Sequence, residues 1–341
     1  MSAGTKTDGR LRVGVAGAGW VTQHHLDAWR ALEDRATVVA IADPVRSAAA
    51  ARATAYRIPA VHASVDAMLR AGDIDVIDVA APREFHAPIC RQAARHGIAI
   101  LCQKPLAPNL EEAESLVAEV RGRARLMVHE NWRFRPHYRR IFAWLREGRV
   151  GQVRTVTMSI LTSGLLPDER GALPALVRQP MLANLERMLL MEVMIHHVDT
   201  LRFLLGPLML HAARLGRTCT AIRGEDRAAL FLTAANGAAV SLVGDFMAHG
   251  QPQQQFDSLA IHGTHGAITL HGNRLGLEGE TREAMVLDLD ANYKASYVGV
   301  FTHFLDRLAD GAPFETGPDD NLETLRIVEA AYRTIVEDPE M

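Results

Sequence analysis

The sequence predicts an α/β protein of two domains, in which a parallel sheet covered by helices is followed by a mostly antiparallel sheet. A chain of 341 residues is longer than one hydrophobic core comfortably serves. From residue 11 to about residue 128, short apolar runs alternate with longer helix-like segments, a pattern typical of parallel strands joined by crossover helices. In the second half, short runs of alternating apolar and polar residues follow one another closely, which favours antiparallel strands.

A glycine-rich turn follows the first predicted strand, Leu11–Ala16, and leads into a helix-like segment over residues 21–32. Gly17 permits the tight turn, and Gly19 lets the backbone approach a pyrophosphate that faces the free N–H groups of the helix. In the fingerprint G-x-G-x-x-G, Thr22 replaces the third glycine. The turn therefore predicts a site for the phosphates of a dinucleotide.

The second predicted strand, Thr37–Ala42, ends on Asp43. This acid lies about 20 residues beyond the turn, the interval at which a carboxylate accepts hydrogen bonds from the adenosine ribose. A glycine-rich turn beside an ordinary surface Asp is the alternative, and the flanking strands disfavour it. Arg46 complicates the prediction, because a guanidinium there accommodates a 2′-phosphate. We expect NAD rather than NADP.

Two further predicted strands, residues 75–80 and Ile98–Cys102, each run into a polar segment. Because ligands bind at the carboxyl ends of parallel strands, residues 81–86 and 103–105 are candidate site segments. Lys104 places an ammonium near the expected nicotinamide, where it can stabilise negative charge on a reacting oxygen. An ordinary surface lysine in a turn is the alternative.

The remaining pattern predicts a last strand of the first domain and then the elements of the second. The irregular stretch in this second part is long enough to suggest a functional loop. The predicted elements are a strand at 126–128, a helix at 136–147, a strand at 153–161, the loop 163–184, a helix at 186–205, strands at 228–235, 238–246, 258–262 and 267–270, and helices at 297–309 and 319–336.

The predicted helix at 186–205 carries an acid, an imidazole and a second acid at i, i+4 and i+7. Glu192, His196 and Asp199 would share one face, while His197 points about 100° away. A His held by acids can remove a proton from a hydroxyl, as alcohol oxidation by hydride transfer requires. A buried polar network explains the spacing equally well. Metal binding is less favoured, because neither H-E-x-x-H nor a cysteine pair is present.

Composition narrows the class of protein. A net charge of −3 gives no basic surface for nucleic acid, and 48% hydrophobic with 23% charged residues is ordinary for a globular enzyme. Three scattered cysteines fit a reducing cytoplasm, and no apolar run approaches the roughly 18 residues of a membrane span. We therefore expect a cytoplasmic protein with a disordered polar leader over residues 1–10.

Several motifs in order resemble the Gfo/Idh/MocA family of glucose-fructose oxidoreductase and inositol dehydrogenase-like proteins. The resemblance runs from about Leu11 to the C-terminal helix. The family motifs E-K-P, T-P-x-x-x-H, N-x-R-F-x-P, D-x-G-x-H-x-x-D and G-T-x-G, and its closing helix, match residues 103–105, 81–86, 131–136, 192–199, 263–266 and 329–332.

The resemblance implies a Rossmann dinucleotide-binding domain over residues 11–130. It implies that residues 131–341 form a substrate-binding and oligomerisation domain with a large open, mostly antiparallel sheet, whose final helix packs back on the Rossmann domain. NAD or NADP would be the cofactor, and a sugar-like or polyol compound the substrate. The protein would be a homodimer or homotetramer through that sheet. From the absence of metal-ligand spacings noted above, we expect no bound metal.

The resemblance also implies roles for individual residues. Lys104 would orient the substrate hydroxyl, His196 would be the general acid/base, and Glu192 would hold the imidazole or the substrate. Pro82 and His86 would line the nicotinamide side. The full set of candidates is Gly17, Gly19, Trp20, Val21, Asp43, Arg46, Pro82, His86, Gln103 and Lys104 for the cofactor, and Asn131, Arg133, Glu192, His196 and His197 for the substrate.

Three departures from the family motifs concern the site. Gln103 replaces a Glu and removes a charge beside Lys104, and Glu192 replaces an Asp with a longer side chain. Met194 replaces a Gly, which suggests a more apolar pocket and a less polar substrate. The sequence thus predicts a dehydrogenase, and Lys104 with His196 favours it over two alternatives. These are a redox-neutral glycosidase-like enzyme that retains NAD, and a non-catalytic dinucleotide sensor.

Overall fold

The computed structural model describes residues 9–334, and the chain divides into two compact units. Of the described residues, the first unit joins 9–134 to 293–323, and the second joins 135–292 to 324–334. Most of the predicted disordered leader, residues 1–8, lies outside the described residues.

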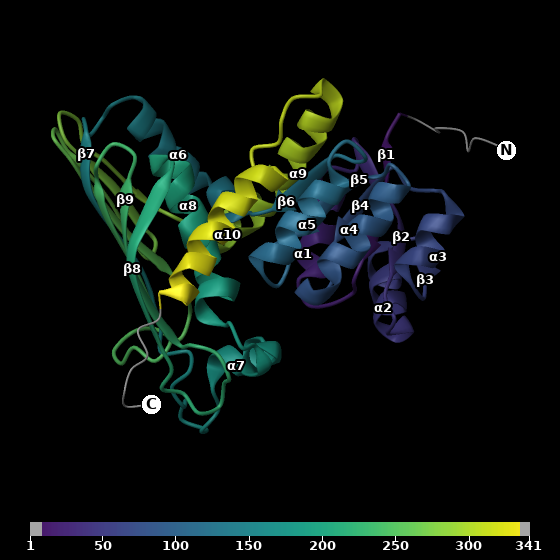
Figure 1. Ribbon diagram of the computed structural model, residues 1–341, viewed down its shortest axis with the longest axis horizontal. Helices are drawn as coiled ribbons and strands as arrows, with labels where there is room; N and C mark the ends of the chain where they lie inside the picture. Colours follow the sequence, from purple (N-terminus) through teal and green to yellow (C-terminus); the bar gives the residue numbers. More distant parts are fainter. Residues whose placement is uncertain (1–8, 335–341) are drawn as a thin grey trace. The chain divides into compact units, whose positions relative to one another are not determined.

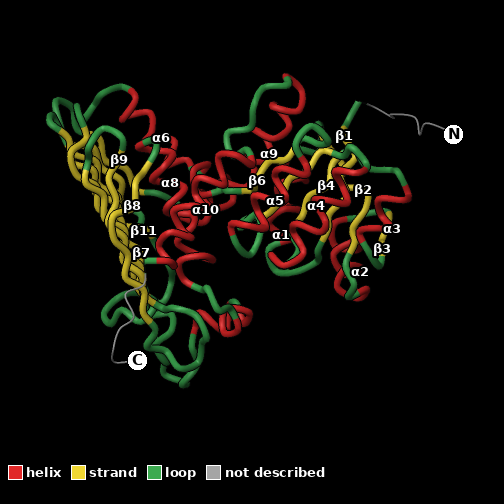
Figure 2. Tube along the Cα trace, viewed as in Figure 1, coloured by secondary structure: helices red, strands yellow, loops and turns green. Residues whose placement is uncertain are grey.

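The first unit contains a six-stranded parallel sheet in the order β3-β2-β1-β4-β5-β6, with helices on both faces (Figure 2). Strand order reverses between β1 and β4, and ligands of open α/β sheets bind at such a switch point. The Rossmann prediction is confirmed. The strands are β1 Leu11–Ala16, β2 Ala36–Ala42, β3 Ala60–His62, β4 Val76–Val79, β5 Ala99–Gln103 and β6 Leu126–His129.

Helices connect these strands, and two of them begin at side-chain caps. The hydroxyl of Ser64 accepts a hydrogen bond from the N–H of Ala67, and the side chain of Asn109 accepts one from the N–H of Glu112. The connecting helices are α1 Thr22–Ala31, α2 Arg46–Tyr56, α3 Val65–Ala71, α4 His86–Arg95 and α5 Leu110–Val120, with short 3₁₀ turns η1 Arg83–Phe85 and η2 Trp132–Phe134.

A helix from far along the chain completes the core of the first unit. Helix α9, Leu289–Asp310, begins eight residues before its predicted start at residue 297, and α10, Pro318–Arg333, follows it. Phe301 of α9 is fully buried, and its ring packs edge-on against Trp29 of α1 with centroids 4.4 Å apart. The first unit therefore depends on a segment that the chain supplies only after residues 135–292 of the second unit.

The second unit contains an eight-stranded sheet in the order β14-β13-β12-β11-β7-β10-β9-β8. All neighbouring strands are antiparallel except β7 and β10, so the sheet is mixed and mostly antiparallel, as predicted. The strands are β7 Val153–Leu161, β8 Leu208–Gly216, β9 Arg227–Ala234, β10 Ala239–Asp245, β11 Asp257–Gly263, β12 Ala267–His271, β13 Arg274–Glu278 and β14 Glu283–Val286.

Alternation along the strands separates a buried face of this sheet from an exposed one. In β9, Leu230 and Leu232 are buried while Phe231 between them is 49% exposed. Helices α6, Pro136–Arg146, and α8, Ile195–Leu205, lie on one side of the sheet, and the other side is open in Figure 1.

Two predictions for the second unit need correction. The loop predicted at 163–184 contains a short helix, α7 Pro174–Arg178, and a 3₁₀ turn, η3 Pro180–Asn184. The helix predicted at 186–205 begins at Leu189, and its first part, η4 Leu189–Met194, is π-helical, with α8 following it. The wider π turn changes the angular spacing on which the predicted common face depended.

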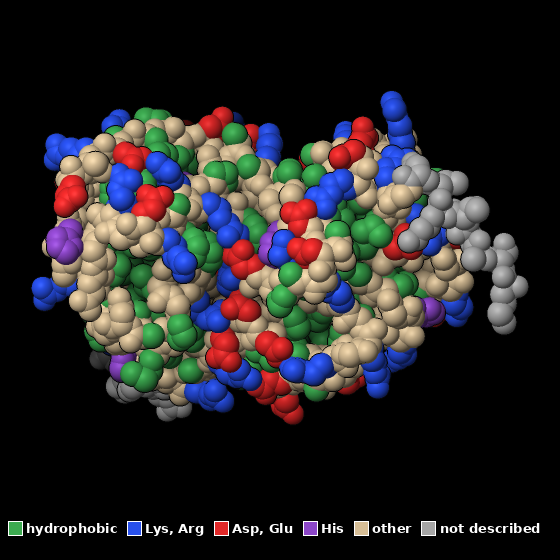
Figure 3. Space-filling model, turned by 90° about the horizontal axis from the view of Figure 1, so that it is seen from above, with side chains coloured by type: hydrophobic (Ala, Val, Ile, Leu, Met, Phe, Trp, Pro, Cys, Tyr) green, Lys and Arg blue, Asp and Glu red, His purple; other side chains and the backbone are tan. Residues whose placement is uncertain are grey.

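Charged side chains of both signs are intermingled on the face of the molecule seen in Figure 3. Over residues 9–334, no helix is long and apolar enough to cross a membrane.

Candidate active site

The glycine-rich turn between β1 and α1 has the conformation that a dinucleotide site needs. Gly17 has φ +108°, and a Cβ there would lie 2.5 Å from the carbonyl oxygen of Ala80. A Cβ at Gly19 would meet no atom within 4 Å, so its outer side is open to a ligand. The hydroxyl of Thr22, which stands where a third glycine is usual, donates to the carbonyl of Gly17 at 3.2 Å. Thr22 therefore ties the helix to the turn.

The carboxylate of Asp43 is fixed beside this turn at the end of β2. One oxygen accepts a hydrogen bond from the N–H of Ala18 at 2.8 Å, and the other accepts from the N–H of Val45 at 2.7 Å. The exposed Arg46 begins α2. A half-buried carboxylate held in this place suits ribose hydroxyls and repels a 2′-phosphate. These residues fit NAD.

Lys104 follows β5 at the same edge of the sheet and is only 9% exposed. Its N–H donates to the side-chain oxygen of Gln103 at 2.8 Å, and its peptide bond to Pro105 is cis. His86 lies between the segments after β4 and β5. Its Nδ1 is 2.7 Å from the carbonyl oxygen of Pro105, and its Nε2 is 2.8 Å from that of Ala81. The two candidate segments are thus joined through one buried imidazole.

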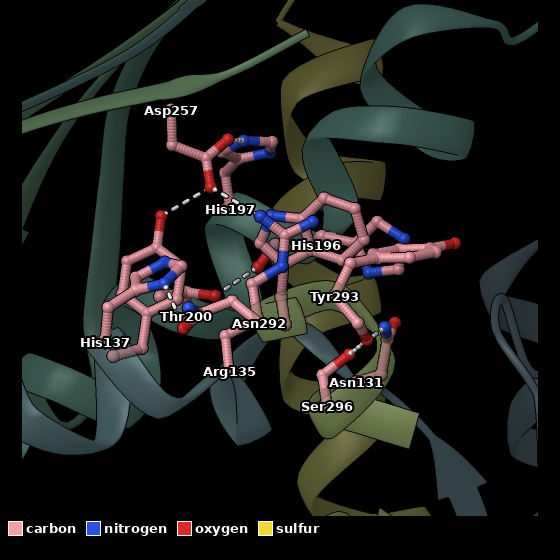
Figure 4. A network of polar contacts seen from close by, with 12 residues as sticks. Asn131, Arg135, His137, His196, His197, Thr200, Asp257, Asn292, Tyr293 and Ser296 are labelled. Atoms are coloured by element: carbon pink, nitrogen blue, oxygen red, sulfur yellow. Dashed lines mark hydrogen bonds and ion pairs between the residues drawn. The ribbon is translucent and has the colours of Figure 1, made fainter. Parts of the chain in front are cut away.

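Two predicted substrate residues lie just beyond β6, and both are buried. Asn131 donates to the hydroxyl of Ser296 on α9 at 2.8 Å (Figure 4). Arg133 donates to Asp320 at 2.8 Å and to the carbonyl oxygen of Glu315 at 3.2 Å. Both side chains therefore connect the β6 segment to the C-terminal part of the first unit, and their contact with substrate stays a prediction.

The second unit carries the acid and imidazole candidates. Glu192 is half-buried in the π turn, and His196, 6% exposed, lies in the first turn of α8. Asp199 is buried and accepts a hydrogen bond from the hydroxyl of Thr324 at 3.2 Å. Asp199 thus contributes to the attachment of α10 within the second unit.

The side chain of Met194 does not support the prediction of a more apolar substrate pocket. It is fully buried, and its sulfur would lie 2.4 Å from a Cβ placed at Gly244 of β10. Met194 therefore packs against the sheet at a position where only glycine leaves room for it.

His197 belongs to a buried network around Asp257, the first residue of β11 (Figure 4). Its Nε2 is 2.9 Å from one carboxylate oxygen, while the hydroxyl of Tyr138 and the guanidinium of Arg135 donate to the other at 2.6 Å and 3.4 Å. Burial alone would raise the pKa of Asp257, but the charge and hydrogen bond of His197, with Arg135 and Tyr138, hold it well below its usual range. This carboxyl is therefore a buried anion.

His137 lies beside this network and is 3% exposed. Its Nδ1 lies 3.2 Å from the side-chain oxygen of Asn292. Burial, with a smaller contribution from the charge of Arg135, lowers the pKa of His137 to about 4. His137 is therefore neutral near pH 7.

Sequence reasoning missed the residues behind the candidate site. Asp78 lies inside the apolar strand β4, and an Asp is almost never buried without partners. Its place in the sequence therefore could have indicated a buried polar network. Its partners are His25 and Trp29 of α1. Asp257 had no such signal, because it lies at the very start of a strand and its partners come from distant segments. Among the described residues, no group of three or more His, Cys, Asp or Glu is arranged to hold a metal ion.

The chain belongs to the Gfo/Idh/MocA family of oxidoreductases. Residues 11–130 match the family's N-terminal model, described as an oxidoreductase family with an NAD-binding Rossmann fold, and residues 138–269 match the GFO/IDH/MocA C-terminal domain. The first unit thus contains an NAD-binding Rossmann domain, and the protein is an NAD-dependent dehydrogenase.

Similar proteins span nearly the whole chain. A D-apiose dehydrogenase of Paraburkholderia graminis is 32% identical over 97% of this chain and 89% of its own length. An inositol 2-dehydrogenase of Rhizobium meliloti is 28% identical over 96% of this chain and 97% of its own. An oxidoreductase from Agrobacterium radiobacter, solved with NAD+, L-tartaric acid and magnesium, has a TM-score of 0.88 at 27% identity, covering 95% of this chain and 96% of its own.

Proposed function

We propose that this protein oxidises a secondary alcohol to a ketone, or a lactol to a lactone, on a sugar or polyol ring, and catalyses the reverse reaction. The observation that carries the proposal is the nearly buried Lys104 at the carboxyl edge of the NAD-binding sheet. NAD, when bound, takes up the hydride that leaves the carbon of the alcohol. Two relatives are named D-apiose dehydrogenase and inositol 2-dehydrogenase. Both names support a polyhydroxylated substrate for this protein.

We propose three roles in proton handling. The imidazole of His196 accepts the hydroxyl proton as the carbon loses hydride, which leaves a carbonyl group. The ammonium of Lys104 donates a hydrogen bond to the same oxygen and stabilises its developing negative charge. Glu192 holds the imidazole or a neighbouring substrate hydroxyl. Asn131, Arg133 and His197 complete the proposed substrate contacts.

The test follows nicotinamide absorbance with NAD and then NADP over a panel of apiose, inositols, aldoses and sugar acids. We expect turnover with NAD and one class of polyol, and a loss of about 10²-fold or more in kcat for His196→Ala and Lys104→Ala. His96→Ala, at an exposed histidine directly after α4, is the matched control. Undiminished activity in His196→Ala would refute its role, whereas tight NAD binding without net turnover would favour a redox-neutral enzyme or a sensor.

We also propose that the open face of the second unit's sheet joins two copies of this chain. Apolar side chains on this face are exposed, among them Met209 at 60%, Phe231 at 49% and Val243 at 39%. They lie on the adjacent strands β8, β9 and β10, so they form one surface suited to a matching sheet. Analytical ultracentrifugation is expected to give a multiple of 37.4 kDa, reduced to the monomer by Phe231→Glu. A monomeric wild-type protein would refute this.

A further inference from the structure

A chain of hydrogen bonds runs from a buried carboxylate to the backbone of Lys104, entirely within the first unit. It consists of Asp78 on β4, His25 on α1, Gln103 at the end of β5, and the N–H of Lys104. His25 and Asp78 are both 0% exposed, and Gln103 is 9% exposed. We call this set the Asp78 chain.

The hydrogens of the Asp78 chain have only one consistent arrangement. The N–H of Lys104 donates to Oε1 of Gln103 at 2.8 Å, so the amide nitrogen of Gln103 faces Nε2 of His25 at 3.2 Å. An amide nitrogen only donates, so Nε2 of His25 is an acceptor and carries no proton. The proton of His25 therefore lies on Nδ1 and is donated to Asp78, 2.9 Å and 3.0 Å from its two oxygens.

The carboxylate end of the chain is held by a second donor. The indole N–H of Trp29 donates to Asp78 at 2.8 Å. His25 is further fixed by ring contacts from other elements, with His129 of β6 stacked at 4.5 Å and Tyr297 of α9 edge-on at 5.5 Å. Asp78 and these two rings are the titratable side chains that contact His25 within residues 9–334. The imidazole therefore has little freedom to rotate or to exchange its tautomer.

We propose that the Asp78 chain positions Lys104 for the reaction, and that the amide of Gln103 makes this positioning insensitive to pH. The inference rests on the proposed function, because it assumes that Lys104 contacts the reacting oxygen. His25, Asp78 and Gln103 are positioning residues, since they act through the Lys104 backbone. An amide at residue 103 needs His25 neutral, so each member of the chain keeps one protonation state while it is intact.

A carboxylate at residue 103 would behave differently. Gln103→Glu keeps an oxygen for the N–H of Lys104 but presents a second oxygen to Nε2 of His25. That oxygen requires a proton on Nε2, so His25 would become an imidazolium between two carboxylates. When pH rises and this proton leaves, the lone pair of Nε2 faces a carboxylate and the contact becomes repulsive. Lys104 would then shift, and activity would fall as pH increases.

The first experiment measures kcat and KM over a pH series for wild type, Gln103→Glu and Gln103→Met. We expect kcat of Gln103→Met to fall about tenfold or more at every pH, with a smaller change in KM for NAD. For Gln103→Glu, the ratio of its kcat to that of wild type should decline with rising pH. If the role of Gln103 were merely structural, both variants would be less stable, but the ratio of the kcat of Gln103→Glu to that of wild type would not depend on pH. Wild-type kcat at every pH in both variants would overturn the proposal, provided that Lys104→Ala is inactive.

A matched pair of tryptophan variants distinguishes the effect of the Asp78 chain on kcat from the effect of losing any buried indole N–H. Trp29→Phe removes the indole donor to Asp78, whereas Trp144→Phe removes a buried indole N–H that has no hydrogen-bond partner in the structure. We expect only Trp29→Phe to lower kcat, at comparable losses of thermal stability. Equal effects of the two variants on kcat would count against the chain.

The tautomer of His25 is a readout that does not depend on activity. Nitrogen-15 NMR of the full-length protein, with His25→Asn to assign the signal, should show a neutral imidazole protonated on Nδ1 near pH 7. A proton on Nε2 would overturn the Asp78 chain even if Lys104 proved essential. If Lys104→Ala stayed fully active, the proposed function of Lys104 would fail and the positioning role with it, whatever the tautomer.

Discussion

The carboxyl group of Asp257 shows how single residues set the charge inside the second unit. A buried carboxylate is costly, and three donors from α6, α8 and the segment before α6 compensate for it. The same carboxylate, together with burial, raises the pKa of the Tyr138 hydroxyl well above its usual value, burial being the larger cause. Tyr138 therefore stays a donor at every physiological pH.

His137 makes stability depend on pH. Its pKa is about 4 in the folded protein and 6.5 for an ordinary His, so the unfolded chain binds a proton that the folded chain refuses in this range. We expect the free energy of unfolding to decrease by about 3 kcal/mol as pH falls from about 6.5 to about 4 through this group. Urea unfolding across that range should show a smaller decrease in His137→Gln. An identical decrease in both proteins would contradict the assignment.

The glycine-rich turn between β1 and α1 contains two glycines with different roles. Gly17 is needed for the backbone conformation, and Gly19 faces open space where a ligand can bind. We expect Gly17→Ala to destabilise the protein by about 2 kcal/mol or more, because of its positive φ and the contact with Ala80. Gly19→Ala should change stability by less than about 0.5 kcal/mol, yet weaken NAD binding, since its methyl group would fill the open space. Thermal melts without NAD and titrations with NADH measure the two effects. Unchanged NADH affinity in Gly19→Ala would refute the second part.

In the π turn η4, the α-helical periodicity assumed for residues 186–205 gave a wrong prediction. Sequence spacing placed Glu192 and His196 on one face of a regular helix, but the first lies in a π-helical segment and the second in α8. The side chain of Glu225 accepts hydrogen bonds from the N–H groups of Met188 and Leu190, at 3.3 Å and 2.8 Å. A partner from outside the helix thus holds its first turn, which no local pattern reveals.

At the scale of the whole molecule, α9 makes the first unit discontinuous in sequence. Phe301 is fully buried there among residues of α1 and the sheet. We expect Phe301→Ala to lower the free energy of unfolding by about 3–5 kcal/mol. Phe85→Ala, at a phenylalanine that is 57% exposed, is the matched control and should change it by about 0.5 kcal/mol or less. Urea unfolding without NAD measures both, and equal effects would mean that α9 does not complete this core.

Most strands of the parallel sheet, its glycine-rich turn and the acid at the end of β2 can be predicted from local sequence. Strands buried on both faces are continuous apolar runs, and a phosphate turn needs its glycines at fixed spacing, so both are local signals. Four strands were not predicted, namely β3, β8, β13 and β14. Many of their residues are partly exposed, and β3, β13 and β14 are also short, so no continuous buried apolar run marks them.

Which polar groups meet depends on how the elements pack in three dimensions. Asp78 with His25 and Gln103, and Asp257 with His197 and Tyr138, join residues from separate elements, 53 and 60 positions apart in two of the pairs. Periodicity describes one element at a time, whereas these contacts depend on how elements pack. The physical reason is that burying a charge requires partners, and the fold supplies them from wherever the chain passes.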